Sequence, residues 1–418
     1  MQPIRVEEYR VVSDETTMRT GSPIGQAPPR ALSRSTTLLF AVASGVAVAN
    51  VYFAQPLLAT LGQDFGISAA SVGIVVTLTQ IGYGLGLFLL VPLGDLVDRR
   101  RLIVTQLVLL ATALTAVGTA ATAPILLTAL AAVGFLAVVT QTLVAFAASL
   151  SPPAERGRVV GLVTSGIVIG ILLARTVSGA LADLAGWRSV YLASAALTLA
   201  LTSALHRVLP RRATPPESMR YGQLLRSTLA LFAQERVFRI RGLLALLIFA
   251  AFSTLWSCVA LPLSEPPLSL SHTAIGAFGL AGAAGALAAA PAGRLHDRGL
   301  AQWTTGTALA LLAVSWLPLA FTRQSLWALV IGAIVLDLAV QAVHVTNQSL
   351  IYTVRPDAGS RLIGGYMVFY SIGSATGAVA STTVYAIAGW GAVCVLGAAI
   401  SVLALLLWAR SSPTARSP

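Results

Sequence analysis

The sequence predicts an all-α integral membrane protein, in which twelve transmembrane helices form two six-helix bundles related by a parallel internal repeat. Hydrophobic residues make up 56% of the chain and charged residues 10%, and the mean hydropathy is +0.82. Soluble domains carry about 25% charged residues, so this chain has too few to cover a water-facing surface. The apolar pattern along the chain and an internal repeat complete the argument for this fold class.

Apolar runs of about 20 residues, the length of a helix that crosses a bilayer about 30 Å thick, recur from residue 36 to residue 409. Each run is predicted to form one transmembrane helix, and these helices are numbered 1 to 12 in chain order. The predicted spans are 36–60, 70–92, 102–121, 124–149, 159–182, 188–208, 242–263, 273–294, 302–321, 325–351, 361–385 and 391–409.

The distribution of basic residues predicts the orientation of these helices. All 27 basic residues are Arg. With the N-terminus in the cytoplasm, only Arg188 and Arg323 fall in outer loops, and Arg175 lies inside helix 5. The other arginines fall in the tails and inner loops, as the positive-inside rule requires. The net charge of +12 therefore reports orientation and does not call for a nucleic acid partner.

We therefore expect a multi-pass protein of a bacterial plasma or inner membrane, with both termini in the cytoplasm. Residues 1–34 lack an apolar core with a cleavage site and are expected to form a disordered tail, not a cleavable signal peptide. Residues 411–418 form a second cytoplasmic tail. Cys258 and Cys394 lie in apolar spans at a spacing that suggests neither a metal site nor a disulfide. No cofactor is expected, and the chain is expected to be a monomer in the lipid bilayer.

A shift of 203 residues superposes landmarks of the first half of the chain on those of the second. The matching pairs include Gly73 with Gly276, Pro153 with Pro356, Arg158 with Arg361, Gly170 with Gly373, and Gly186-Trp187 with Gly389-Trp390. Because each half holds an even number of helices, both halves have the same orientation, as in a parallel repeat about an axis along the membrane normal.

The repeat predicts six-helix bundles at residues 35–209 and 242–410, joined by a cytoplasmic linker at 210–241. The apolar residues of the linker alternate with Arg and Glu from Ser218 onward. This pattern suits an amphipathic helix on the inner leaflet, although a solvated tether fits the composition nearly as well.

Helices 5 and 11 carry small residues at every fourth position: Gly166, Gly170, Ala174 and Ser178 in the first, and Gly373, Gly377 and Ser381 in the second. Small residues at this spacing let helix backbones approach closely in lipid. The pattern fits tight packing within a bundle or a sliding seam between the two halves, and its symmetry favours the seam.

The turns after helices 2 and 8 carry related charged motifs, VPLGDLVDRRRLI and AGRLHDRGL. Each places an Asp just beyond the apolar span and Arg after it. The carboxylate can cap a helix, and the guanidinium can pair with a carboxylate or a lipid phosphate. On these motifs, and on the stretches NVYFAQPLLATLGQDFGIS (50–68) and GWRSVY (186–191), the chain resembles the major facilitator superfamily over residues 36–410. Within it, the chain is similar to the efflux-type branch of drug:proton antiporters and predicted sugar or nucleoside exporters.

The resemblance implies the major facilitator fold, in which two bundles rock about a central site. Helices 1, 4, 7 and 10 would line the cavity, and helices 2, 5, 8 and 11 would form the seam between the halves. The loop motifs would latch the inner gate through Asp95, Arg99, Arg100, Asp297 and Arg298.

Helix 10 carries a stripe of polar residues in the sequence VLDLAVQAVHVTNQ (335–348). Asp337, Gln341, His344 and Gln348 fall at i, i+4, i+7 and i+11, with Asn347 alongside. Such side chains are tolerated in a membrane where they line a water-filled path. Asp337 is the only acid deep in any predicted span, which suggests a proton carrier. His344 could relay the proton or bind substrate, and a structural polar contact is the alternative for both.

Further polar and aromatic residues are expected around the same cavity. Amide and aromatic side chains in a mostly apolar pocket suit a small amphiphilic ligand, although each alone is as readily a packing residue. The predicted substrate-binding residues are Tyr52, Gln55, Gln80, Gln141, Trp256, Gln341 and Asn347, with Tyr83, Thr140 and Phe252 nearby.

A guanidinium inside helix 5 costs about 2.5–3.5 kcal/mol near the helix centre on insertion scales, so Arg175 needs water or an anionic partner. Counted from the inner ends of their helices at about 1.5 Å per residue, Arg175 and Asp337 lie at similar depth. We expect an Arg175–Asp337 pair that forms in one conformation and breaks when Asp337 is protonated or substrate binds. The alternative is that Arg175 binds an anionic group of the substrate.

These features favour a secondary active transporter that couples the efflux of a small amphiphilic organic compound to protons, with Asp337, His344 and Arg175 in the coupling. Proton-coupled uptake is the alternative, because the motifs do not specify direction. An enzyme is not expected: DLVD (95–98) has the wrong spacing for the magnesium sites of intramembrane prenyltransferases, and no second acidic cluster accompanies it. A membrane sensor is disfavoured because the sequence contains no extramembrane signalling domain.

Overall fold

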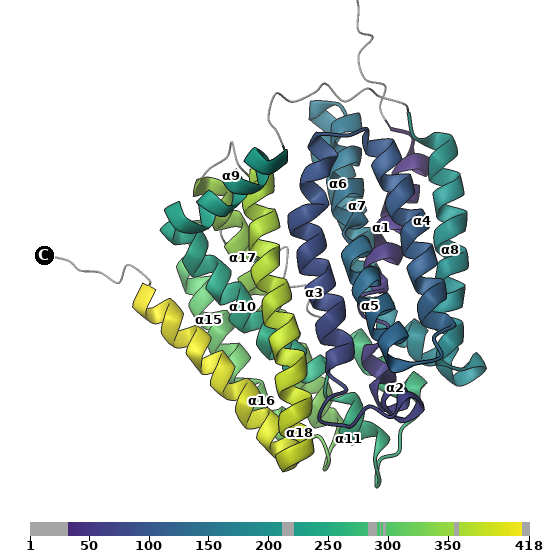
Figure 1. Cartoon of the computed structure of the whole chain (residues 1–418). Coiled ribbons are helices and arrows are strands. Elements are labelled where there is room, and N and C mark those ends of the chain that lie inside the picture. Colours follow the sequence, from purple (N-terminus) through teal and green to yellow (C-terminus); the bar gives the residue numbers. More distant parts are fainter. Residues whose placement is uncertain are drawn as a thin grey trace, which may run out of the picture.

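The computed structural model describes residues 32–210, 221–282, 291–292, 294–295, 298–354 and 359–411, and no strand occurs among them. The described residues form two groups of helices that lie side by side (Figure 1). The N-terminal half runs from α1 to α8 and the C-terminal half from α10 to α18. Nearly all of the two predicted tails falls outside the described residues.

The N-terminal half contains eight α-helices and two short 3-10 helices. They are α1 (Arg34–Ala49), η1 (Gln55–Leu57), α2 (Leu58–Phe65), α3 (Ile74–Leu89), η2 (Val91–Asp95), α4 (Arg99–Gly118), α5 (Ala123–Ala137), α6 (Val139–Leu150), α7 (Pro153–Ala185) and α8 (Trp187–Val208).

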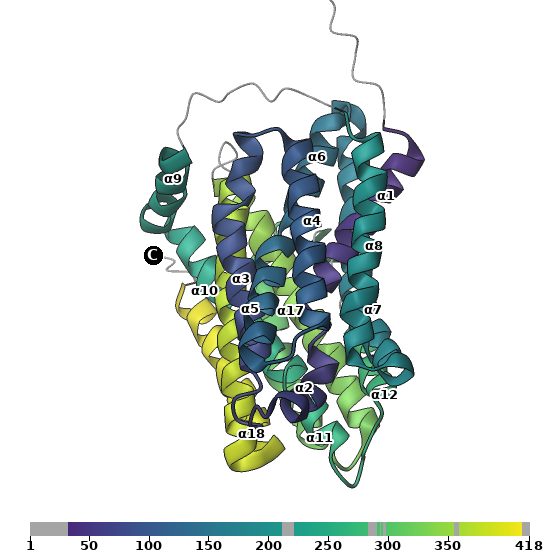
Figure 2. The ribbon, with the colours of Figure 1, turned by 45° about the vertical axis from the view of Figure 1, so that its right-hand side comes forward.

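In the linker between the halves, α9 (Tyr221–Gln234) lies outside the bundle, and the Tyr221 hydroxyl donates to the Leu89 carbonyl at 2.7 Å (Figure 2). The described C-terminal half comprises α10 (Arg236–Trp256), α11 (Ala260–Ser264), α12 (His272–Ala277), η3 (Phe278–Ala281), α15 (Ala301–Val314), α16 (Trp316–Ala320), α17 (Leu326–Val354) and α18 (Gly359–Ser411).

The helices confirm the predicted fold class and follow the predicted spans. Among the described residues, nine helical segments are long and apolar enough to cross a membrane. The last element, α18, contains both predicted helices 11 and 12, which meet at Gly389, where φ is 72°. Predicted helix 1 appears as α1, η1 and α2 with a break between them, and residues 283–290 of helix 8 lie outside the described part of the chain.

The stripes of small residues pack inside each half, so the predicted sliding seam on these residues was wrong. A Cβ on Gly170 would lie 2.2 Å from the Gly45 carbonyl oxygen, which shows how closely α7 approaches α1. The repeat-related Gly373 on α18 approaches Leu246 on α10 in the same way. Spacing alone predicts a close helix contact but does not say which helix makes it.

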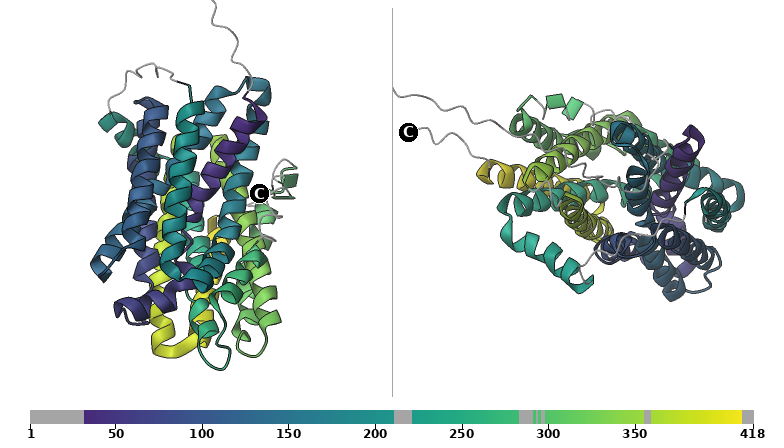
Figure 3. Two further views of the ribbon diagram at one scale, coloured as in Figure 1. Left: turned by 90° about the vertical axis from the view of Figure 1, so that its right-hand side faces the viewer. Right: turned by 90° about the horizontal axis from the view of Figure 1, so that it is seen from above.

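The seam between the halves is formed by α3 against α18 and by α7 against α12. These are the positions of predicted helices 2, 11, 5 and 8, so the seam that the family resemblance implied is confirmed. The Thr77 hydroxyl donates to the Ala375 carbonyl at 2.8 Å, and the Thr176 hydroxyl donates to the Gly276 carbonyl at 3.0 Å. In the view from above, the two halves lie side by side (Figure 3, right).

Two ends of the bundle are named here by the elements that lie there (Figure 1). The α9 end carries α9 and the start of α4. The α2/α11 end, opposite, carries α2, α11 and the break between the two helices of α18.

We expect Gly170→Ala to lower the free energy of unfolding by about 1–3 kcal/mol, the usual cost of overpacking, because the added Cβ meets backbone that cannot move alone. Gly161→Ala is the matched control on the same helix, since a Cβ there meets nothing within 4 Å. Thermal unfolding of the purified protein in detergent measures both. Equal stability of the two variants would contradict the close α1–α7 contact.

Candidate functional site

A buried polar cluster lies where the two halves meet, and Arg175 of α7 is its cation. Its side chain is 3% exposed, and Nε donates to Gln55 Oε1 at 2.6 Å. Its guanidinium carbon lies 4.2 Å from the centroid of the Trp256 ring, 5.4 Å from that of Tyr52 and 5.6 Å from that of Phe252. Nη2 is buried and has no hydrogen-bond partner.

Asp337 of α17 is the anion of this cluster and is 7% exposed. Its Oδ1 accepts a hydrogen bond from Trp256 Nε1 at 3.0 Å. Arg175 and Asp337 attract each other electrostatically, but no ion pair within 4.0 Å joins these two described residues. Trp256 links them instead, because its ring face meets the guanidinium while its N–H meets the carboxylate.

Two of these side chains, Gln55 and Trp256, lie at breaks in helices. The α1 helix ends at Ala49, and the chain resumes with η1, which has Pro56 near its start and Gln55 as its first residue. Trp256 is the last residue of α10, and α11 begins only at Ala260. The two breaks lie in predicted helices 1 and 7, which correspond in the two halves. Discontinuous helices at the interface of repeats are where many transporters place their binding sites.

A tyrosine pair extends the cluster across the seam. The hydroxyls of Tyr52 and Tyr370 share a hydrogen bond with an O–O distance of 2.5 Å. The rings of Phe249 and Tyr83 lie against Tyr370, with centroids 4.2 and 6.4 Å away. Gln80 contacts Tyr370 as well. Tyr370 was not among the predicted residues, although Tyr366 and Ser374 lie one turn before and after it on α18 and mark a polar face.

The side chains around this cluster are more exposed to solvent on the side of the α9 end. Phe252 lies one turn before Trp256 on that side and is partly exposed, as are Gln141 and Gln341. Gln141 contacts the Tyr83 hydroxyl. Tyr52, Gln55, Gln80 and Trp256 are buried deeper. Of the predicted set, Tyr52, Gln55 and Trp256 contact Arg175 or Asp337. Gln80 and Gln141 contact the nearby tyrosines, and Gln341 lies one turn from Asp337 on α17.

His344 and Asn347 belong to a separate polar group within the C-terminal half. His344 Nδ1 lies 2.9 Å from the Tyr366 hydroxyl, and its Nε2 lies 3.3 Å from Gln348 Nε2. Asn347 is fully buried and accepts a hydrogen bond from Arg241 Nη1 at 3.2 Å. Arg241 is only 6% exposed, although the sequence analysis counted it among the arginines of the linker.

Thr140 also points elsewhere, since its hydroxyl donates to the Ala137 carbonyl at 2.9 Å within the N-terminal half. Cys258 and Cys394 are free and buried.

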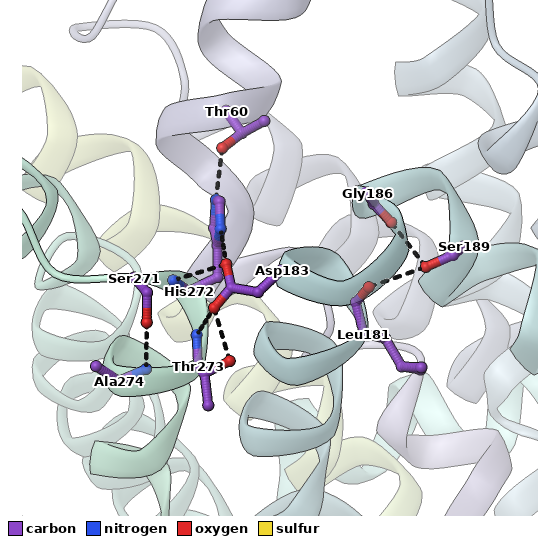
Figure 4. A network of polar contacts seen from close by, with 9 residues as sticks. All are labelled: Thr60, Leu181, Asp183, Gly186, Ser189, Ser271, His272, Thr273 and Ala274. Carbon is purple, nitrogen blue, oxygen red and sulfur yellow. Dashed lines mark hydrogen bonds and ion pairs between the residues drawn. The ribbon is translucent and has the colours of Figure 1, made fainter.

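At the α2/α11 end, Asp183 ties α7 to the start of α12 (Figure 4). Its Oδ2 accepts from the backbone N–H of Thr273 at 2.7 Å and from the Thr273 hydroxyl at 2.6 Å. Its Oδ1 lies 2.7 Å from His272 Nδ1, and His272 Nε2 lies 2.7 Å from the Thr60 hydroxyl of α2. This network, which was not predicted from the sequence, joins the two halves at the α2/α11 end.

At the α9 end, the predicted gating arginines bind backbone carbonyl groups. Arg99 Nε donates to the Gly94 carbonyl at 2.8 Å and Nη1 to the Ala145 carbonyl at 3.2 Å, while Arg100 donates to the His206 carbonyl. The side chain that caps α4 is Asp98, which accepts from the Arg101 N–H at 2.7 Å.

The structure does not describe the side chain of Asp95, and Asp297 lies outside the described residues. For Arg298, the described contact is a backbone one, in which its N–H donates to the Arg294 carbonyl at 3.2 Å.

The two stretches that carried the family resemblance contact each other. Trp187 Nε1 donates to Asp64 Oδ2 at 2.7 Å, Arg188 lies 3.6 Å from the same oxygen, and the Phe65 and Trp187 rings pack edge to face. These motif residues therefore hold α2 to the start of α8 within the N-terminal half.

The fold and its repeat agree with a comparison of the sequence with protein families. The model of the Major Facilitator Superfamily matches residues 40–264 and 242–418. The chain belongs to the major facilitator superfamily. It is a membrane-embedded transporter of a small molecule and not an enzyme.

Related proteins of this superfamily are also transporters by name. The uncharacterized transporter YgaY of Escherichia coli O157:H7 is 45% identical over 383 residues, which cover 92% of this chain and 97% of YgaY. A protein of Streptomyces coelicolor named "Probable transporter SCO4007" is 34% identical over 391 residues, covering 91% and 88% of the two chains.

Among solved structures, a bacterial homologue of the human lysosomal transporter Spinster, in an inward-facing and occupied conformation, has a TM-score of 0.71 at 15% identity. The match covers 92% of this chain and 97% of that chain. This likeness supports the fold.

We expect Asp183→Asn to weaken closure at the α2/α11 end, because an amide nitrogen cannot accept the hydrogen bonds that one carboxylate oxygen accepts from Thr273. Loss of such capping contacts costs about 1 kcal/mol. Spin labels on cysteines at Gln63 and Gln324, which are exposed on opposite halves at this end, should report a larger population of long distances by double electron–electron resonance.

Asp64→Asn is the matched control, because Asp64 contacts only its own half through Trp187 and Arg188. Its distance distribution should match that of the parent protein. Unchanged distances in Asp183→Asn would contradict the role of this network in holding the halves together.

Proposed function

We propose that this transporter couples the movement of a small amphiphilic organic compound to protons, by alternating access to the cluster around Arg175 and Asp337. One observation carries the proposal: a buried guanidinium lies over the ring of Trp256 and a buried carboxylate accepts from its N–H, where the two halves meet. A central site of this kind is exposed to one side and then to the other when the halves rock.

The contacts along the seam support a conformation that is closed at the α2/α11 end. Asp183 joins the halves there through Thr273 and His272. Partly exposed residues lie toward the α9 end, which favours access from that side. If the termini are cytoplasmic, as the arginine distribution predicts, this is an inward-facing arrangement.

Asp337 is the proposed proton carrier. A buried carboxylate is stable only with partners that compensate its charge, and it has one described hydrogen bond, from Trp256. Movement of Trp256 or Arg175 would therefore change the balance between its charged and protonated forms. His344 is a weaker candidate, since it bonds Tyr366 and Gln348, away from Asp337.

The gating role of Asp95, Arg99, Arg100, Asp297 and Arg298 remains part of the proposal. The contacts of Arg99 with Gly94 and Ala145 support it, because they fix the turn after α3 against α6. A latch at the α9 end would complement the Asp183 network at the other end.

Two directions of transport, export and uptake, are each favoured by a different observation. The resemblance to efflux-type members favours export in exchange for protons. The unpartnered Nη2 of Arg175 favours the second candidate, uptake together with protons, because an anionic substrate placed there adds negative charge beside Asp337.

We expect Asp337→Asn to abolish transport driven by a pH gradient while substrate exchange across the membrane persists, because Asn keeps the shape and hydrogen bonding of Asp but carries no exchangeable acidic proton. Everted vesicles energised with a proton gradient and screened with a compound panel identify a substrate. Proteoliposomes that contain the full chain then separate driven transport from exchange.

Asp64→Asn serves again as the control, since Asp64 lies outside the cluster. Gradient-driven transport that persists undiminished in Asp337→Asn would exclude Asp337 as the essential carrier.

A further inference from the structure

Arg175 has an unused hydrogen-bond donor in the centre of the molecule. Nε is bound to Gln55, whereas Nη2 is buried without a partner. Buried guanidinium nitrogens are almost always satisfied, because a lost hydrogen bond to a charged group is costly. An unpaired N–H on a buried cation therefore marks the place of an acceptor.

The acceptor is not supplied by the neighbouring protein groups. Asp337 is the nearest acid, but its Oδ1 is bound to Trp256 and no ion pair joins it to Arg175. The other titratable groups facing Arg175 are the phenols of Tyr52 and Tyr370, which bond each other. The α12 and η3 elements present Gly276 and Gly279 to it.

The aromatic side chains around the guanidinium indicate what the rest of the ligand is like. Its faces meet the rings of Trp256, Tyr52 and Phe252, and aromatic surfaces accept both a cation and an apolar body. Phe252 is partly exposed on the side of the α9 end. A ligand that enters there reaches Nη2 after passing an aromatic wall.

We infer that Arg175 binds the oxyanion of a small organic acid, a carboxylate or an equivalent group, whose apolar body lies against Phe252 and Trp256. This assignment rests on the proposed transport function and names the substrate class of the same site. A guanidinium is suited to it, because its planar fork donates two parallel hydrogen bonds to a carboxylate.

Charge balance then sets the sign of proton coupling. The empty cluster holds one cation and one anion. A second anion beside Asp337 would leave an uncompensated buried charge, which costs several kcal/mol, unless Asp337 takes up a proton. The organic acid and the proton therefore bind together, and they move in the same direction.

The test uses the purified full chain in detergent and a series of phenylalkanoates, each compared with the amide and the amine of the same carbon chain. Binding is measured by isothermal titration and by thermal stabilisation at about pH 6 and about pH 8. We expect the carboxylates to bind about 10- to 100-fold more tightly than their amides, the range of one charge-assisted hydrogen bond, and more tightly at the lower pH.

Two variants separate the contributions. Arg175→Gln should remove the preference for carboxylate over amide. Arg241→Gln is the matched control, because Arg241 is also a buried arginine but bonds Asn347 within the C-terminal half; it should keep the preference. Asp337→Asn mimics the protonated carboxyl group, so carboxylate binding should become nearly independent of pH even if Arg175→Gln fails to fold.

The outcomes distinguish this inference from the proposed function. Carboxylates that bind no better than their amides would overturn the inference and assign Nη2 to a buried water. A preference that survives Arg175→Gln would overturn it too. Proton-driven transport of an amine alone would leave the proposed function standing without the inference, whereas carboxylate binding without any gradient-driven transport would overturn the function alone.

Discussion

The contact of Trp256 with both Arg175 and Asp337 is the interaction on which the centre of this transporter depends. A buried cation and a buried anion must each be compensated, because removing charge from water costs several kcal/mol per ion. Here the ring face stabilises the guanidinium and the indole N–H stabilises the carboxylate. One side chain therefore contacts both charges, and a ligand that moves it would change the surroundings of both.

The fold places Trp256 at a break in a helix, where its side chain is not held by a continuous helix on both sides. Trp256 ends α10 just before a break, and Gln55 begins η1 just after another. On both sides of the seam, glycines bring α7 against α1 and α18 against α10 within their own halves. The seam is packed as closely, since a Cβ on Gly73 would lie 2.5 Å from the Ala378 carbonyl oxygen and a Cβ on Gly276 would lie 2.3 Å from the Arg175 carbonyl oxygen. Hydroxyl groups, the Asp183 carboxylate and the tyrosine pair add hydrogen bonds across it.

Sequence reasoning recovered the features that depend on composition and helix geometry. Hydrophobic length gave the spans, the 203-residue repeat gave the two halves, and the rise per residue placed Arg175 and Asp337 at one depth. Features that depend on which surfaces meet were not recovered. Asp183 and His272 are 89 residues apart, and Tyr52 and Tyr370 are 318 residues apart. The glycine stripes indicated a close contact but not the helix that makes it.

The free energy of the hydrogen bonds across the seam can be compared with the free energy needed to switch between two conformations. Among the described residues, it contains a small number of hydrogen bonds, including those of Thr77, Thr176, Tyr52 and Asp183. Each contributes about 0.5–1.5 kcal/mol, so their sum is a few kcal/mol. To reverse a 1:99 population of two conformations requires about 5.5 kcal/mol of differential binding. In the proposed mechanism, an organic acid that satisfies Arg175 and brings a proton to Asp337 leaves the net charge of the central cluster unchanged but replaces the partners of both side chains. An uncompensated buried charge costs several kcal/mol, so this exchange can supply a difference of that order, to which the contacts at either end add. The central charges and the contacts at the ends together therefore set which conformation is stable.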